Sequence, residues 1–92
     1  MDEIFEALHL PGTIVVDVRT PAEYANGHYT ESINIPLTEL ENNIEKLRYA
    51  NRVMVCCASG VRSQKACILL RQKGIESIDG GSWLSIDQHS KK

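Results

Sequence analysis

The chain has 92 residues, 42% of them hydrophobic and 24% charged, and a formal net charge of −2 at pH 7. The length and ordinary composition predict one soluble domain over residues 1–92, and the charge balance gives no reason to expect nucleic acid as a partner. No apolar run approaches the roughly 20 residues of a membrane span, and the acidic start at residues 1–3 differs from a basic secretory signal, so we expect no membrane association and no secretion.

Short β-like runs alternate with helical segments in the first third of the chain. Residues 2–8 predict a short helix with its apolar side chains on one side. Residues 13–18 (TIVVDV) form a β-branched and largely apolar run, which predicts a strand covered on both faces. Thr20 caps a third element, a helix over residues 21–24 that begins with proline. Residues 32–35 (SINI) predict a second strand, which a proline ends.

The middle of the chain predicts a longer helix that begins at Thr38. Leu40, Ile44 and Leu47 recur at helical spacing, which places them on one face. Glu41 stands three residues after Thr38, so the two residues fit a capping box. We therefore expect one continuous helix through Leu47.

The last half of the chain repeats the alternation of strand and helix. Residues 52–57 (RVMVCC) predict the most hydrophobic strand, and residues 61–73 predict a helix that a glycine ends. Residues 75–78 offer a stub of strand, residues 79–81 (DGG) a turn, and residues 82–88 a final short helix. Such alternation predicts an α/β fold with a small parallel sheet flanked by helices on both faces, and a site at the carboxyl ends of the strands.

Three cysteines are present, namely Cys56, Cys57 and Cys67. An odd number excludes a complete set of disulfides, and no CxxC pair or histidine cluster has the spacing of zinc ligands. This usage indicates a reducing compartment, so we expect a cytoplasmic protein with at least one free thiol. Nothing in the sequence calls for self-association, and we expect a monomer. Cys67 lies in the helix expected at residues 61–73, and we expect it to pack in the hydrophobic core.

The segment after Cys57 has the features of an anion-binding loop. Small residues and Gly60 allow the chain to curl until its amide N–H groups converge, and the following helix aims its positive end at the same point. Arg62 adds a fixed positive charge. Each feature favours a thiolate at Cys57, although a buried structural cysteine at the end of a strand remains the alternative.

Four motifs in order resemble the single-domain rhodanese, or thiosulfate sulfurtransferase, family. They are VDVRTPAEYANGH at residues 16–28, INIP at 33–36, VCCASGVRSQKA at 55–66 and DGG at 79–81. The resemblance implies a rhodanese-like fold. The chain departs from the family pattern at residues 75–79. Only these five residues separate Gly74 from the paired glycines, whereas the family usually has several more, so we expect the strand in this segment to be shortened.

The resemblance also implies a mechanism. The Cys57 thiolate would attack the sulfane sulfur of a small anionic donor such as thiosulfate and release sulfite, and the Cys57 persulfide would pass its sulfur to cyanide, a thiol or a protein acceptor. No metal or organic cofactor would be required. The residues implied to bind the substrate anion are Ala58, Ser59, Gly60, Val61 and Arg62.

Three polar residues in the first motif are expected to support the scaffold. Asp17 and Arg19 can pair near the end of a strand and hydrogen-bond to neighbouring loops. His28 is a candidate acid–base group, but sulfite leaves without a proton at neutral pH, so structural support is the preferred interpretation.

Two other functions stay open. Counted from Cys56, Arg62 completes a Cys-x5-Arg loop, the form used by phosphatases that share the fold and by some arsenate reductases; counted from Cys57, it completes the shorter rhodanese loop. Adjacent strand residues face opposite sides, so only one of the two sulfurs can point into the loop. We favour Cys57 because the rhodanese family usually carries an apolar residue before its cysteine, where Cys56 fits, and because the position of the loop glycine counted from Cys57 matches the rhodanese pattern. A carrier that receives a persulfide and passes it on in thiolation pathways is the second alternative.

Overall fold

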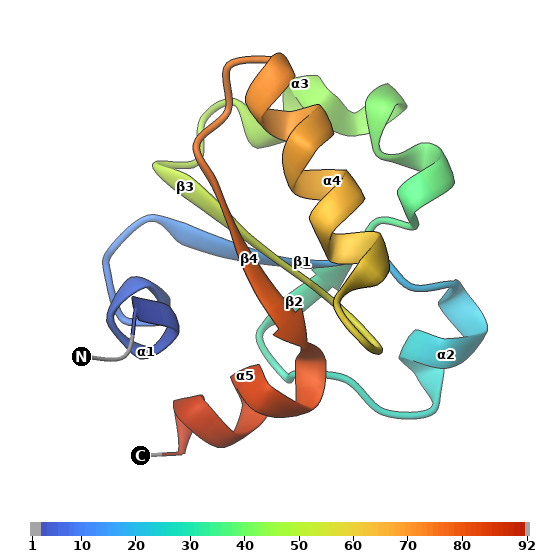
Figure 1. Cartoon of the computed structure of the whole chain (residues 1–92), viewed down its shortest axis with the longest axis vertical. Helices are drawn as coiled ribbons and strands as arrows, with labels where there is room; N and C mark the ends of the chain where they lie inside the picture. The colour runs from blue at the N-terminus through green and yellow to red at the C-terminus, as the bar shows by residue number, and fades with distance from the viewer. Residues whose placement is uncertain (1–2, 92) are drawn as a thin grey trace.

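Four parallel strands form the centre of the molecule, and helices cover both faces of the sheet (Figure 1). The computed structural model describes residues 3–91. The strands lie in the order β2-β1-β3-β4, and their bounds are β1 Thr13–Asp17, β2 Ser32–Asn34, β3 Arg52–Cys57 and β4 Ser77–Ser82. The α-helices are α1 Glu3–Leu8, α2 Pro21–Ala25, α3 Ile44–Leu47, α4 Val61–Gln72 and α5 Trp83–Ser90. The expected α/β architecture is confirmed.

The central strand β3 contributes alternate side chains to two separate cores, because successive strand residues point to opposite faces. Val53, Val55 and Cys57 are buried with the residues of α3 and α4. Met54 and Cys56 are buried on the other face, with residues of α1 and α5. The two neighbouring cysteines therefore lie in different environments, on opposite sides of the sheet.

Several elements form where the sequence predicts them. β3 has the expected bounds, and α4 ends at Gln72, just before Gly74 adopts a positive φ of 81°. Thr20 caps α2, and its side chain accepts a hydrogen bond from the Glu23 backbone N–H. The helix expected at residues 2–8 is α1, and its expected first residue, Asp2, lies outside the described residues.

The continuous helix expected from Thr38 to Leu47 is wrong. Two 3₁₀ turns, Leu37–Glu39 and Glu41–Asn43, precede the one-turn helix α3, and no side chain caps either turn. Asn43 explains the break, because its side-chain amide donates to the Glu39 carbonyl at 2.8 Å while its backbone N–H bonds Leu40 instead. The apolar spacing still buries Leu40, Ile44 and Leu47.

The turn expected at residues 79–81 is also wrong, because these residues belong to β4. The strand passes through both glycines with a shift of register opposite Val55 and Cys56, a β-bulge. Close packing favours glycine at position 80, since an added Cβ would lie 2.6 Å from Ile86 Cδ1 and 3.1 Å from the Val55 backbone carbonyl oxygen. Glycine in this strand marks a bulge and a close approach rather than a turn.

The carboxyl ends of all four strands meet at one edge of the sheet. Asp17 pairs in register with Asn34 of β2 and with Cys56 of β3, and Cys57 pairs with Ser82 of β4. Within residues 3–91 no helix is both long and apolar enough to cross a membrane. The edge where the strands end is where the candidate site lies.

Candidate active site

The loop that follows β3 curls back over Cys57 and directs two backbone N–H groups at its sulfur. The Gly60 N–H donates to Cys57 Sγ at 2.9 Å, and the Ser63 N–H, in the first turn of α4, donates at 3.4 Å. Gly60 has a φ of 100°, a left-handed conformation that favours glycine. The loop and the start of α4 therefore form the predicted ring of donors around the sulfur.

This arrangement stabilises the thiolate form of Cys57. Burial alone would raise the pKa of the Cys57 thiol, because a charge is poorly solvated there. Backbone N–H groups of Ser63, Gly60 and Ser59 oppose this effect and hold the Cys57 pKa below its ordinary value of 9.0. The site thus favours a charged sulfur at Cys57 although its side chain is fully buried.

The other two cysteines lack such a ring of donors. Cys56 is fully buried on the opposite face of the sheet, and burial raises the pKa of its thiol. Cys67 is buried on α4, and burial again raises the pKa of the thiol. Of the two registers that the sequence leaves open, the fold places Cys57, and not Cys56, against the loop amides.

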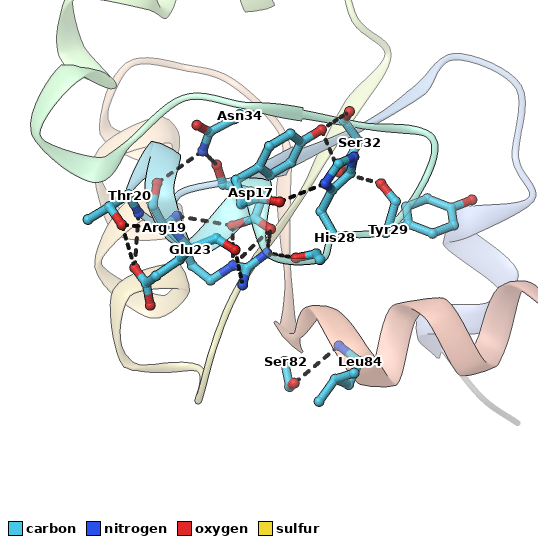
Figure 2. A network of polar contacts seen from close by, with 12 residues as sticks. Asp17, Arg19, Thr20, Glu23, His28, Tyr29, Ser32, Asn34, Ser82 and Leu84 are labelled. Atoms are coloured by element: carbon cyan, nitrogen blue, oxygen red, sulfur yellow. Dashed lines mark hydrogen bonds and ion pairs between the residues drawn. The ribbon is translucent and has the colours of Figure 1, made fainter.

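The guanidinium of Arg62 is not an isolated charge, because it forms an ion pair with Glu23. Its Nη1 and Nη2 donate to both carboxylate oxygens of Glu23 in α2, at 2.7 and 3.0 Å. Glu23 Oε1 also accepts from the Thr20 backbone N–H at 3.0 Å (Figure 2). The Arg62 pair first, and then the Thr20 N–H, lower the pKa of Glu23 to about 2. The carboxylate is therefore ionised at any physiological pH.

A second contact ties the start of α4 to β4. The Ser63 hydroxyl lies 2.6 Å from Asp79 Oδ1 and donates to it, and the Gly81 N–H donates to the same oxygen at 2.9 Å. Ser63 is fully buried. Since Ser63 also donates its N–H to Cys57 Sγ, Asp79 helps to fix a residue that holds the sulfur.

Asp17 and Arg19 form a buried pair beside the site. Arg19 Nε and Nη2 donate to the two Asp17 oxygens at 2.9 and 2.8 Å, and Nη2 also donates to the Gly27 carbonyl at 2.8 Å (Figure 2). The guanidinium lies 5.1 Å from the ring centre of Trp83. These contacts join β1 to α5 and to the loop that follows α2. This is the supporting role expected for Asp17 and Arg19.

His28 is also engaged in local structure. Its Nδ1 donates to the Tyr24 carbonyl at 2.7 Å, and the two rings stack with 3.7 Å between centroids. The Tyr24 hydroxyl in turn donates to the Ser32 carbonyl at 2.6 Å, so the stack joins α2 to β2. These contacts fit the supporting role expected for His28.

The five residues predicted to bind the substrate anion differ in their contacts with the Cys57 sulfur. Gly60 donates to the sulfur, Ala58 and Ser59 are exposed, and Val61 begins α4 with its side chain in solvent. Their role in binding an anion stays a prediction, as does that of Arg62.

Three contributing residues, Glu23, Ser63 and Asp79, were not identified from the sequence. Glu23 stands three residues after Thr20, and that capping-box spacing was the available signal. Ser63 was visible as the residue after Arg62, but nothing in the sequence pairs it with Asp79. Among residues 3–91 no group of three or more His, Cys, Asp or Glu side chains is arranged to hold a metal ion.

Comparison with known proteins identifies the family. A family model described as a rhodanese-like domain matches residues 1–82. The chain belongs to the rhodanese-like family. The family expected from the four sequence motifs is thereby confirmed.

Known relatives of this rhodanese-like chain agree in sequence and in fold. A protein of Allochromatium vinosum named "Sulfurtransferase" is 34% identical over 61 residues, which are 66% of this chain and 57% of that protein, little more than half its length. The structure of a "rhodanese with anions" from E. coli has a TM-score of 0.72 and 29% identity, covering 79% of this chain and 89% of its own. The structure of a rhodanese-like domain protein of Staphylococcus aureus has a TM-score of 0.77 and 27% identity, and the match covers 89% of this chain and 80% of that protein.

Proposed function

We propose that this rhodanese-like protein is a sulfurtransferase that moves sulfane sulfur through a persulfide on Cys57. The observation that carries the proposal is the pair of N–H groups, from Gly60 and Ser63, that converge on Cys57 Sγ at the N-terminus of α4. Donors aimed at a sulfur lower the free energy of its anionic form, and the thiolate is the nucleophile. The family match and the name of the Allochromatium vinosum relative support the same chemistry.

The proposed reaction has two halves. The Cys57 thiolate attacks the outer sulfur of thiosulfate or of a persulfide donor, a new S–S bond forms, and the S–S bond to the leaving group breaks. With thiosulfate the leaving group is sulfite, which takes both electrons of the broken bond and both negative charges. The Cys57 persulfide keeps one negative charge, which the loop amides that hold the thiolate are placed to share.

In the second half a thiophilic acceptor attacks the outer sulfur of the Cys57 persulfide. Cyanide would give thiocyanate, and a thiolate would give a new persulfide; either step returns the Cys57 thiolate. No proton has to be delivered, which agrees with the engagement of His28 in contacts with Tyr24. The three cysteines are free thiols, which fits action in a reducing compartment such as the cytoplasm.

Mass spectrometry of the intact protein tests the proposal. After treatment with thiosulfate we expect a gain of one sulfur atom, which cyanide removes. The gain should be absent in Cys57→Ser and present in the matched variant Cys56→Ser, because Cys56 lies on the other face of the sheet. An adduct that persists in Cys57→Ser, or one that disappears in Cys56→Ser alone, would contradict the assignment of the nucleophile.

A further inference from the structure

The ion pair between Arg62 and Glu23 lies next to the loop that holds Cys57. Arg62 is the second residue of α4, one position before Ser63, whose N–H donates to the sulfur. Both guanidinium nitrogens face the two Glu23 oxygens, and both side chains are about one third exposed, at 33% and 37%. Arg62 at the start of α4 is thus matched by one carboxylate, that of Glu23.

Glu23 is held independently of Arg62. The Thr20 backbone N–H and hydroxyl donate to Glu23 Oε1 at 3.0 and 3.1 Å, and the Thr20 hydroxyl oxygen accepts from the Glu23 N–H at 3.3 Å. This capping box fixes the carboxylate at the start of α2, before the ion pair to Arg62 is considered. The carboxylate is therefore a permanent part of the electrostatic surroundings of the loop.

Arg62 and Cys57 are close enough to interact electrostatically. The Glu23 carboxylate raises the pKa of Arg62 most, and the negative charges of Cys57 and Asp17 raise it further. A charge on the Arg62 guanidinium therefore affects an anion at the Cys57 sulfur, and so does the carboxylate that neutralises it.

We propose that Glu23 is a positioning residue that sets the charge of the donors accepted at Cys57, by holding Arg62 in a neutral pair and so disfavouring dianionic donors relative to monoanionic ones. The proposal rests on the proposed sulfur transfer and names the class of donor: one whose sulfane group carries a single negative charge, such as an organic persulfide or a thiosulfonate. Thiosulfate, with two charges, would load Cys57 less efficiently than an uncompensated arginine would allow.

Two small donors of similar shape separate the effect of charge from that of size. Thiosulfate is a dianion and releases sulfite; the methanethiosulfonate anion is a monoanion and releases methanesulfinate. In both reactions the Cys57 thiolate forms one S–S bond, one S–S bond breaks, and the leaving group keeps the electron pair. The ratio of kcat/KM for thiosulfate to kcat/KM for methanethiosulfonate therefore measures the preference for charge.

The test variant is Glu23→Gln, because glutamine also serves in a capping box and keeps the start of α2 intact while the charge is lost. We expect the thiosulfate-to-methanethiosulfonate ratio to rise about fivefold at low ionic strength, as one negative charge near the loop is removed. The rise should shrink when salt shortens the screening length. A merely structural role would lower both rates together and leave the ratio and its salt dependence unchanged.

Arg62→Gln provides the opposite change, since it leaves the Glu23 carboxylate without its partner. The ratio should fall below that of the wild type, and the double variant Glu23→Gln/Arg62→Gln should return near it. A ratio in Glu23→Gln that stays unchanged or falls overturns the inference while sulfur loading still supports the proposed function. If neither donor loads Cys57 in the wild-type protein, the proposed function and the inference both fail.

Discussion

Replacing Gly60 by alanine should weaken the hold of the loop on the Cys57 sulfur. Gly60 has a φ of 100°, and only the Gly81 Cα, at 3.8 Å, would lie near an added Cβ, so the cost is conformational rather than steric. A left-handed conformation costs an alanine roughly 1–2 kcal/mol. We expect the backbone to relax out of this region and to turn the Gly60 N–H away from Cys57 Sγ.

The loss of that N–H should be visible in the ionisation of Cys57. A hydrogen bond to a charged group contributes about 1.5–3 kcal/mol, so the ratio of thiolate to thiol at a fixed pH should fall by a factor of roughly 10 to 150. The ultraviolet absorbance of the thiolate, followed against pH with Cys57→Ser as the blank, measures this ratio without requiring access to the buried sulfur. Loading by thiosulfate at neutral pH should slow in parallel.

Gly74→Ala is the matched control. Gly74 has a φ of 81°, follows the other end of α4, and has no atom within 4 Å of an added Cβ. Urea denaturation should show a similar loss of stability in both alanine variants, about 1 kcal/mol. Only Gly60→Ala should change the titration of Cys57. An unchanged titration in Gly60→Ala, or an equal change in Gly74→Ala, would refute the role given to the Gly60 N–H.

Two further outcomes follow from the site and its support. Because folding lowers the pKa of Cys57 below its ordinary 9.0, the native state binds fewer protons than the unfolded state between those two values, and stability there rises with pH. The free energy of unfolding of the wild type relative to Cys57→Ser, from urea titrations, should therefore grow from below the native pKa up to pH 9; a difference that is flat or falls would contradict it. Asp17→Asn should cost about 3–5 kcal/mol in the same assay, since it leaves the buried Arg19 without its partner, and a loss under about 1 kcal/mol would show that the pair is not needed.

The sequence predicts the first three strands well because they are specified locally. After Arg52, residues 53–57 are all β-branched or sulfur-bearing, and residues 52–57 form β3 without a change of bounds. Thr20 with its proline, and the glycine at position 74, mark helix ends through backbone geometry that acts within one turn. The position of Cys57 in the site followed from the same local reasoning.

What the sequence does not predict depends on side chains that meet only in the folded chain. The helix expected from Thr38 fails because the Asn43 amide takes the carbonyl of Glu39 that a helical N–H would use. Gly80 signals a turn by composition, whereas in the fold the close approach of Ile86 and of the Val55 carbonyl oxygen favours glycine within the strand. Arg62 finds Glu23 39 positions away in the chain, and no spacing rule indicates that pair.

Because alternate side chains of β3 are buried in two different cores, the packing of these cores determines which cysteine faces the loop. A slip of β3 by one residue would bring Cys56 to the loop and lengthen it to Cys-x5-Arg, the loop form of oxyanion chemistry. The same slip would move Val53 and Val55 out of one core and Met54 out of the other. Cys56 and Cys57 thus offer two loop lengths one residue apart, and the buried side chains of β3 select between them through their packing. Mutations in the core of β3, and not only in its loop, should therefore affect which sulfur faces the loop amides.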